Sequence, residues 1–192
     1  MTGLDPSPPP PLIDEPGLVD RARTDPEAFA VLYRHYLPRI HALAQRRTGS
    51  PHLADDITAT TFERALRGLD GFRWEQGGFG AWLHRIAVNV ITDHHRARGR
   101  STHDRAQAAM ARLAPTPVPE AADTGSGRDV RAALDRLTPR YQEALTLRYL
   151  TDLDHREAAA ACGMPPARFA VVLHRAKAAL RRELGIRPGD GA

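Results

Sequence analysis

Residues 82–96 read WLHRIAVNVITDHHR, and this stretch decides the fold because its apolar and polar residues recur at helical spacing. The apolar side of the helix, which should face a core, consists of Trp82, Leu83, Ile86, Ala87 and Val90. A second line of residues, the basic stripe, follows at spacings of four, three and four and consists of Arg85, Asn89, Thr92 and Arg96. Such a helix can pack on its own domain and touch a polyanion, although cations near a helix C-terminus also stabilise the helix dipole.

The composition and charge of the chain favour a partner that carries phosphate groups. The 192 residues have room for one domain or two small ones, and 27 Lys+Arg against 23 Asp+Glu give a formal net charge of +4. Cations gather at residues 85–105 and 168–187, whereas the first 25 residues are net acidic. Most of the cations are arginines, which suit bidentate contacts with phosphate and guanine.

Several kinds of site and location are disfavoured. The single cysteine, Cys162, excludes an internal disulfide and belongs to no cluster of metal-ligand type. His84 and His94 fall on different helix faces, so we expect no metal and no other cofactor. No apolar run approaches the roughly 20 residues of a membrane span, and the acidic N-terminus is unlike a signal peptide, so we expect a cytoplasmic protein.

The first half of the chain is predicted to be a helical domain behind an unstructured arm. Residues 1–24 are rich in proline and are expected to form a disordered arm. Residues 25–100 carry helical periodicity without the alternation of a strand, and Thr24 or Asp25 is placed to cap the first helix. The expected helices run from Pro26 to Gly49, from 51 to 68 and from 81 to 98, with the side chains Leu53, Ile57, Thr61, Phe62, Ala65 and Leu66 of the second facing inward.

The second half is predicted to be a smaller helical domain on a tether. Residues 101–127 lose periodicity, although 104–113 have room for a short helix, and their prolines and glycines indicate a flexible linker. Residues 128–185 contain cap signals at Thr138 and Asp154, and residues 186–192 form a tail. A short helix at 155–162, a glycine-containing turn and a longer basic helix to about 184 form a helix-turn-helix pattern. The fold class is therefore all-α, with two small helical domains joined by a flexible linker.

Two blocks of sequence resemble bacterial RNA polymerase sigma factors. The strings LTPRYQEALTLRYL (137–150) and HRAKAALR (174–181) resemble region four of that family. In the first half, LADD (53–56) and TFERA (61–65) resemble the polymerase-binding part of region two, and WLHRIAVN (82–89) with Asp93 resembles its promoter-melting part. Because only regions two and four are matched, the resemblance is to the extracytoplasmic-function (ECF) subfamily, over about residues 25–100 and 128–185.

The resemblance implies that the helix at 51–68 binds core RNA polymerase. The docking face of this helix consists of Asp55, Asp56, Glu63, Arg64 and Arg67. Its acidic members are suited to basic groups of the polymerase and its arginines to acidic ones. The alternative is a solvated helix face with pairs such as Glu63–Arg67, each worth only ~0.3–0.5 kcal/mol.

The resemblance also implies that the loop at 72–80 captures an unpaired base of the −10 promoter element. In this aromatic loop, the rings of Phe72 and Trp74 and the guanidinium of Arg73 offer planes for stacking. The basic stripe offers the amide of Asn89 for reading a base edge. The alternative is that Phe72 and Phe79 are core residues and Trp74 is an exposed loop residue. We expect one of the two phenylalanines to be core, with Phe79 the better candidate.

The last helix departs from the family pattern. Its recognition face, expected to contact the −35 promoter element, consists of Arg168, Val171, His174, Arg175 and Lys177. The family usually places polar residues where this chain has Arg168-Phe169-Ala170-Val171-Val172. Arg175 still reaches a phosphate or a guanine edge and Lys177 a phosphate, whereas Val171 only touches a thymine methyl. Readout of the −35 element should therefore be thinner than is usual in the family.

These features predict an ECF-type sigma factor that binds core RNA polymerase and promoter DNA, with an anti-sigma factor as a possible further partner, and that is not an enzyme. The first alternative is a helix-turn-helix transcriptional regulator that acts without polymerase, but such a protein has no need of the aromatic loop beside the basic stripe. The second alternative is a helical enzyme with a histidine site, which no Ser/His/Asp cluster, carboxylate pair or phosphate loop supports.

Overall fold

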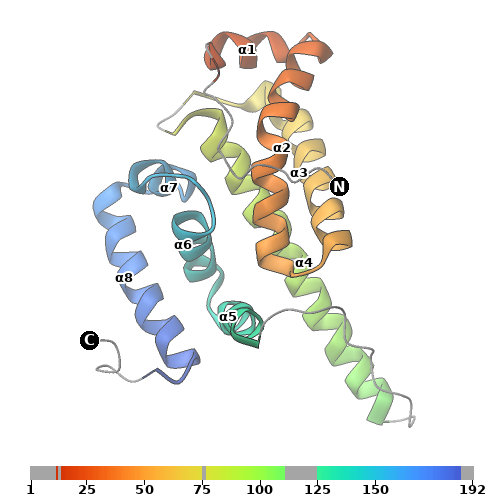
Figure 1. The fold of residues 1–192 in the computed structure, drawn as a ribbon, viewed down its shortest axis with the longest axis vertical. Coiled ribbons are helices and arrows are strands. Elements are labelled where there is room, and N and C mark those ends of the chain that lie inside the picture. Colours follow the sequence, from red (N-terminus) through yellow and green to blue (C-terminus); the bar gives the residue numbers. More distant parts are fainter. Residues whose placement is uncertain (1–11, 13, 75–76, 111–124, 187–192) are drawn as a thin grey trace.

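The computed structural model describes residue 12 and residues 14–74, 77–110 and 125–186. Within these ranges the chain is helical and has no strand, which confirms the all-α prediction (Figure 1). The elements are α1 (Glu15–Ala22), α2 (Pro26–Thr48), α3 (Pro51–Gly68), the 3₁₀ turn η1 (Leu69–Gly71), α4 (Gly78–Met110), α5 (Gly125–Arg136), α6 (Pro139–Tyr149), α7 (His155–Ala161) and α8 (Pro166–Glu183). No helix of these described ranges is long and apolar enough to cross a membrane.

The first domain is a bundle of α2, α3 and α4, with α1 across one end of α2 (Figure 1). Local sequence sets the helix ends. The Asp25 side chain accepts a hydrogen bond from the Glu27 N–H at 2.9 Å and starts α2, and Gly49 ends that helix in the left-handed region at φ 69°. Asp25 rather than Thr24 is therefore the cap.

Large side chains fill the centre of this bundle. The most completely buried of them are Leu32, Ile40, Leu43, Ile57, Leu69, Phe79, Leu83 and Ile91. The apolar side of α4 faces this core as expected, with Leu83 and Ala87 fully buried and Trp82 partly buried. Leu66 was expected to face inward but is 52% exposed, because the buried line of residues runs through Phe62 and Ala65 to Leu69, and Leu66 lies to one side of it.

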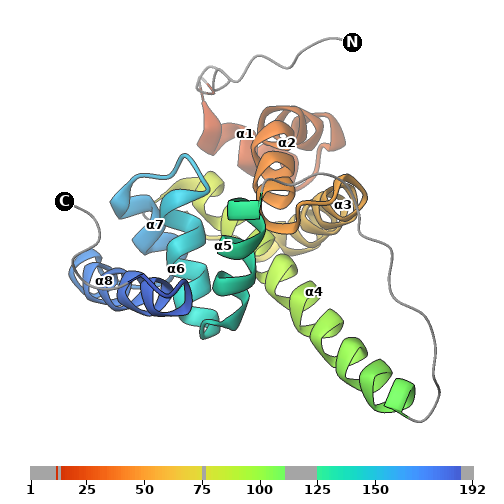
Figure 2. The ribbon, with the colours of Figure 1, turned by 60° about the horizontal axis from the view of Figure 1, so that its bottom comes forward.

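Two expectations about the ends of the first domain are wrong. Residues before 24 were expected to be disordered, but α1 forms and buries Leu18 and Val19 against α2. A hydrogen bond from the Tyr36 hydroxyl to Glu15 also ties α1 to α2. The helix expected at 81–98 begins at Gly78 and continues to Met110, so it takes up residues assigned to the linker and to a separate short helix. In Figure 2 the C-terminal half of α4 extends away from the other helices.

The second domain consists of α5 to α8, and its core combines many alanines with leucines and one phenylalanine. Leu147 and Phe169 are its most completely buried large side chains, and its buried alanines include Ala133, Ala144, Ala158, Ala159, Ala161 and Ala176. Asp154 and Glu157 form a capping box at the start of α7, as the cap signal predicts. Thr138 precedes α6 but makes no side-chain cap bond, and α5 begins at Gly125, inside the expected linker.

The two domains pack against each other. Helix α4 contacts α6 and α7, and a single apolar core runs from α1 to α8. Figure 1 shows α8 on the side of the second domain that faces away from α2, α3 and α4. The helix-turn-helix therefore meets the first domain through α7 and leaves the outer side of α8 open.

Candidate nucleic-acid interface

The aromatic loop is held in place by α1, an element that sequence analysis missed. The Arg23 guanidinium donates hydrogen bonds to the backbone carbonyls of Leu69 and Asp70 at 2.7 and 2.8 Å and of Phe72 at 3.0 Å. A guanidinium offers five donors in a fixed fork, so it can satisfy three carbonyls at once. Arg23 thus fixes the backbone from which Trp74 projects.

The structure separates the aromatic residues of the loop into buried and exposed ones. Phe72 is 4% exposed and packs against Phe79 and Trp82 at ring-centroid distances of 5.9 and 5.0 Å. Both phenylalanines are therefore core residues, and Phe72 cannot stack on a base while it holds this position. Trp74 is 49% exposed and meets Phe72 edge-on at 5.8 Å, so it offers the free aromatic plane.

A small cavity lies between the loop and the second domain. It has a volume of about 220 Å³ and is lined by Phe72, Arg73, Gly78, Trp82, Arg85 and, from α7, Ala160 and Ala161. The approach is close, because a Cβ atom at Gly77 would lie 3.3 Å from the Cβ of Ala160. Gly77 also has φ 99°, a backbone conformation that favours glycine. Helix α7 thus forms one wall of the site expected to receive an unpaired base.

The basic stripe lies along the edge of α4, as expected. Arg85, Asn89 and Arg96 are exposed, and the Thr92 hydroxyl donates to the Val88 carbonyl at 2.8 Å. The Arg85 guanidinium faces the turn of the helix-turn-helix, 3.6 Å from where a Cβ of Gly163 would lie. Burial raises the pKa of the Glu143 carboxyl on α6, and the nearby Arg85 opposes that shift. The N-terminal end of the stripe is thus partly covered by the second domain, and its C-terminal end is open.

The docking face is exposed along α3 and carries its own ion pairs. Glu63 and Arg67 pair at 2.6 Å, and Arg64 reaches across to Asp93 of α4 at 3.1 Å. Asp55 lies 3.1 Å from the His41 ring of α2. Exposed pairs of this kind stabilise a protein only weakly, by about 0–1 kcal/mol, so they can exchange for partner groups at little cost.

The recognition face lies on the outer side of α8. Phe169 and Ala176 are fully buried beneath it, and Arg168, Val171, His174 and Arg175 are exposed. Lys177 is half-buried beside an apolar groove that also contains Leu180. The turn before α8 contains Cys162, whose thiol has its pKa raised to about 12 by burial and by the nearby Glu143, so it stays protonated.

Two carboxylates of the second domain each pair with an arginine of the first and lie close to one of its histidines. Asp135 of α5 accepts from Arg47 Nη2 at 2.9 Å and lies 3.2 Å from His95 Nδ1. Burial would raise the pKa of the Asp135 carboxyl, but His95 and Arg47 outweigh it and hold the pKa below its ordinary value. Because the Arg47 side chain is only 2% exposed, its pairing with Asp135 is a requirement of the docked arrangement.

The second contact joins Asp152, between α6 and α7, to Arg39 at 3.0 Å and to His84 at 3.7 Å. His84 is buried in the first domain and donates from Nδ1 to the Gly80 carbonyl at 2.8 Å. Burial lowers the pKa of His84, and the hydrogen bond to Gly80 and the Asp152 carboxylate only partly oppose that effect. The imidazole is therefore neutral at pH 7.

Comparisons with known proteins match both domains of the chain to known families. The family model of Sigma-70 region 2 matches residues 32–101, and that of Sigma-70 region 4 matches residues 127–180. The chain is 34% identical over 153 residues to the ECF RNA polymerase sigma factor SigE of Mycolicibacterium smegmatis, covering 78% of this chain and 59% of that protein. It is 30% identical over 156 residues to the ECF RNA polymerase sigma factor EcfG of Rhodopseudomonas palustris, covering 81% and 83%.

Solved structures of similar fold include a sigma factor bound to an anti-sigma factor. It is the sigma factor RpoE in complex with the anti-sigma factor NepR from Bartonella quintana, with a TM-score of 0.55 and 24% identity, covering 84% of this chain and 99% of that chain. The chain spans about six tenths of the length of the first of these relatives and most of the second.

Proposed function

This chain belongs to the ECF RNA polymerase sigma factors, and from that premise we propose that it binds core RNA polymerase, directs it to a promoter and helps to melt the −10 region. Members of this family are transcription initiation factors rather than enzymes. A helix-turn-helix regulator that acts without polymerase is disfavoured, because residues 32–101 match region 2.

The observation that carries the proposal is an exposed aromatic plane beside the first turn of the helix that carries the basic stripe. Trp74 is exposed and lies next to Gly78 at the start of α4, Arg23 binds the backbone of the loop, and Arg73 and Arg85 line the small cavity to which Gly78 also belongs. Stacking on an aromatic side chain is worth ~1–3 kcal/mol per base, so an exposed plane at the end of a helix that carries Arg85 and the Asn89 amide suits capture of an unpaired base. Arg73, Trp74, Arg85, Asn89, Thr92 and Arg96 are the residues we assign to the −10 element.

The remaining surfaces complete the proposal. The docking face on α3 would meet core polymerase, and the recognition face on α8 would meet the −35 element. Partners are core polymerase and promoter DNA, and the chain would act in the cytoplasm. An anti-sigma factor is a further proposed partner, since a sigma factor of the same fold is bound to one.

Use of both promoter elements requires the two domains to separate. Elements centred about 25 base pairs apart are ~85 Å apart along a duplex at ~3.4 Å per base pair. In the docked arrangement Arg85 lies beside Gly163, at the turn that precedes α8, and the 18 residues of α8 extend only ~27 Å, so the two surfaces are much closer together than the two promoter elements. The docked arrangement, held by Asp135 and Asp152, is therefore a closed form that must open on the promoter.

The test of this function is transcription in vitro with core polymerase and a promoter library. The chain should support initiation from a subset of promoters that core polymerase alone does not use. Charge reversal of the docking face by Asp55→Lys with Asp56→Lys should weaken capture of core polymerase while helicity is unchanged, and Asp129→Lys on α5 serves as the control. If the chain supports no initiation, the proposed promoter function is wrong. If both reversals together leave capture of core polymerase intact, the assignment of the docking face is wrong.

A further inference from the structure

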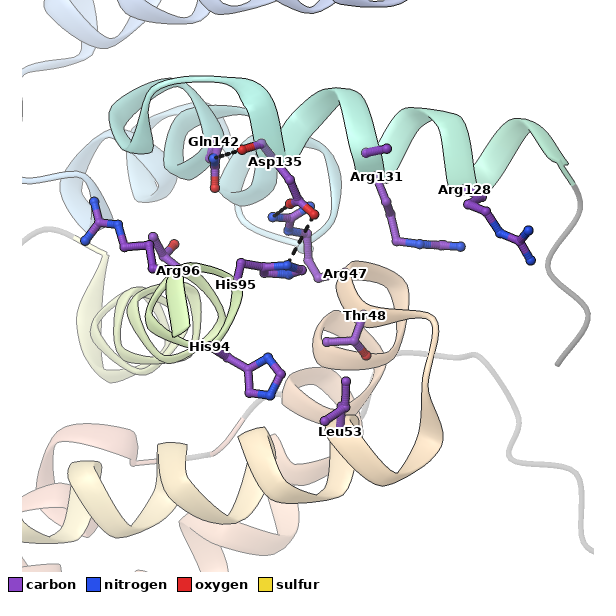
Figure 3. Close-up of a pocket in the computed structure, with 12 residues that line it drawn as sticks. Arg47, Thr48, Leu53, His94, His95, Arg96, Arg128, Arg131, Asp135 and Gln142 are labelled. Atoms are coloured by element: carbon purple, nitrogen blue, oxygen red, sulfur yellow. Dashed lines mark hydrogen bonds and ion pairs between the residues drawn. The ribbon is translucent and has the colours of Figure 1, made fainter. Parts of the chain in front are cut away.

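A basic cleft lies between the two domains, outside the surfaces assigned to DNA and polymerase except at Thr92 and Arg96. It has a volume of about 590 Å³ and is bounded by the C-terminal end of α2, by α4, by α5 and by the start of α6 (Figure 3). Its cations come from both domains, and they are Arg47 and Arg96 of the first and Arg128 and Arg131 of the second. Among the described residues of the lining Asp135 is the single carboxylate, so these residues carry an excess of positive charge.

Polar atoms at the base of the cleft have unused hydrogen-bonding capacity. The Arg47 side chain is 2% exposed, and although Nη2 binds Asp135, Nη1 has no partner among the described residues. Gln142 is 7% exposed and donates from Nε2 to the carbonyls of Asp135 and Leu137 at 3.1 and 2.8 Å, which leaves its Oε1 unused within the same ranges. Buried polar groups normally have partners, so these atoms indicate a ligand.

The His95 ring contributes a third such atom. Its Nδ1 lies 3.2 Å from the Asp135 carboxylate, and its Nε2 is buried without a hydrogen bond in the part of the chain that the structure describes. Either ring nitrogen of an imidazole can take part in a hydrogen bond, so Nε2 is available to a bound molecule while Nδ1 faces Asp135. The base of the cleft thus combines donors for an anion with one acceptor, Gln142 Oε1.

We propose that this cleft binds a small phosphorylated metabolite of nucleotide size. Guanidinium groups bind phosphate oxygens through paired N–H donors, and Arg128 and Arg131 supply them from the wall opposite Arg47. A sugar hydroxyl or an amino group of the base would donate to Gln142 Oε1. The volume falls within the ~300–1,000 Å³ typical of small-molecule sites. A small molecule fits better than a nucleic-acid strand, because Arg47 and Gln142 are buried at the base between the two domains.

Such a ligand would regulate the proposed promoter function, on which this second step rests. Because both domains supply its contacts, it binds the closed form and not the open one. A ligand that binds one of two states shifts the equilibrium toward that state by mass action. The metabolite would therefore keep the aromatic loop and Arg85 against the second domain and lower initiation.

Isothermal titration calorimetry of the full chain tests the site, with GTP, ATP, inorganic triphosphate and the single strand dT12 as probes. At least one nucleoside triphosphate should bind with one site per chain. Arg128→Ala with Arg131→Ala should weaken that binding by about tenfold or more, and Arg34→Ala on exposed α2 should leave it unchanged. Gln142→Met should weaken nucleotide binding until its affinity approaches that of inorganic triphosphate. The affinity for inorganic triphosphate itself should not change.

The outcomes separate the site from its consequence. Absence of binding by both nucleotides, or binding insensitive to the paired arginine change, overturns the site. Binding of dT12 through the same arginines in preference to nucleotides shows a nucleic-acid surface and also overturns it. If a nucleotide binds but does not lower open-complex formation, which is measured without RNA synthesis, the regulatory step is overturned and the site stands. A chain that binds nucleotide but supports no initiation contradicts the promoter function alone.

Discussion

The two surfaces assigned to promoter DNA differ in how far the closed form leaves them available. The recognition face lies on the outer side of α8, with Val171 51% exposed, and faces away from the first domain. The −10 surface lies on the inner side, where Gly77 approaches Ala160 of α7 and Arg85 approaches the turn at Gly163. On the proposed function, the closed form leaves the −35 surface available and restricts the −10 surface, so we expect promoter melting to require separation of the domains.

The domains also differ in how they are stabilised. Long aliphatic and aromatic side chains make up most of the buried apolar residues of the first domain, whereas alanines form a larger share of those of the second, beside Leu147, Phe169 and other leucines. A smaller core that is richer in alanine buries less apolar surface per residue and depends more on each large side chain. We therefore expect the second domain to unfold first when one of its large buried residues or its contacts with the first domain are removed.

The largest effect should come from Phe169→Ala, which removes the fully buried ring beneath the recognition face. Loss of a buried phenylalanine with little possibility of collapse costs about 3–5 kcal/mol. Denaturant unfolding followed by circular dichroism measures it, with Val171→Ala on the exposed side expected within about 0.5 kcal/mol of the unchanged protein. Equal losses for both changes would show that the recognition face is not placed by this core.

Asp135→Asn should cause the next largest loss of stability, because it leaves the buried Arg47 without its carboxylate partner. The loss should be about 2–3 kcal/mol, below the ~3–5 of a fully buried pair, because the Asp135 side chain is 32% exposed. Denaturant unfolding gives the loss of stability. Proteolytic cleavage in the segments that the closed form covers, such as α7, should become faster. Asp129→Asn is the control, and a variant as stable and as closed as the unchanged protein would mean that Asp135 does not hold the domains together.

Substitutions at the −10 surface should outweigh one at the −35 surface. Trp74→Ala and Asn89→Ala should each reduce promoter opening more than Arg168→Ala does, by about 1–3 kcal/mol of stacking or base contact. The recognition helix has Ala170 and Val171 at positions where donors are usual in the family. Open-complex formation on promoters with −10 or −35 substitutions measures this difference. A silent Trp74→Ala, with −35 changes costing more than −10 changes, would make the loop structural.

The smallest effect concerns acid. Because burial lowers the pKa of His84 below its ordinary value of 6.5, the unfolded chain takes up a proton there before the folded chain does. The neutral ring thus contributes stability above pH 6.5 that is lost as the pH falls below that value, with Asp152, Arg39 and Arg46 acting on the same ring. The free energy of unfolding should fall from pH about 7.5 to about 5.5, and less steeply in His84→Asn, which keeps a donor. Identical slopes in the unchanged protein and in His84→Asn would show that His84 does not cause this pH dependence.

Much of this molecule follows from local patterns in the sequence. Cap signals and helical periodicity predict α2, α3, α7 and α8, since Asp25 and Asp154 act through neighbouring backbone. Helix α1 escaped prediction because Pro16 and the proline-rich residues before it suggest disorder, although proline suits a first helical turn and Leu18 and Val19 find a core on α2. The long α4 escaped it because polar residues at 97–110 lack an apolar side.

The candidate site was predictable in its exposed residues and not in its contacts between domains. Trp74 and the basic stripe follow from residue type and spacing. The pairing of Arg47 with Asp135 joins residues 88 positions apart, and nothing local marks either as a partner of the other. For the same reason Phe72 was assigned to the surface, because only the packing of Phe79 and Trp82 around it shows that it is buried.

The most direct test of the closed form is the distance between the domains, before and after promoter binding. Spin labels at Arg34→Cys on α2 and Arg182→Cys on α8, in a Cys162→Ser background, report that distance by electron paramagnetic resonance. The free chain should show one short, narrow distribution, and the complex with core polymerase and promoter should shift it outward by roughly tens of ångströms. An unchanged distance in a complex that melts the promoter would contradict the coupling of domain separation to −10 recognition.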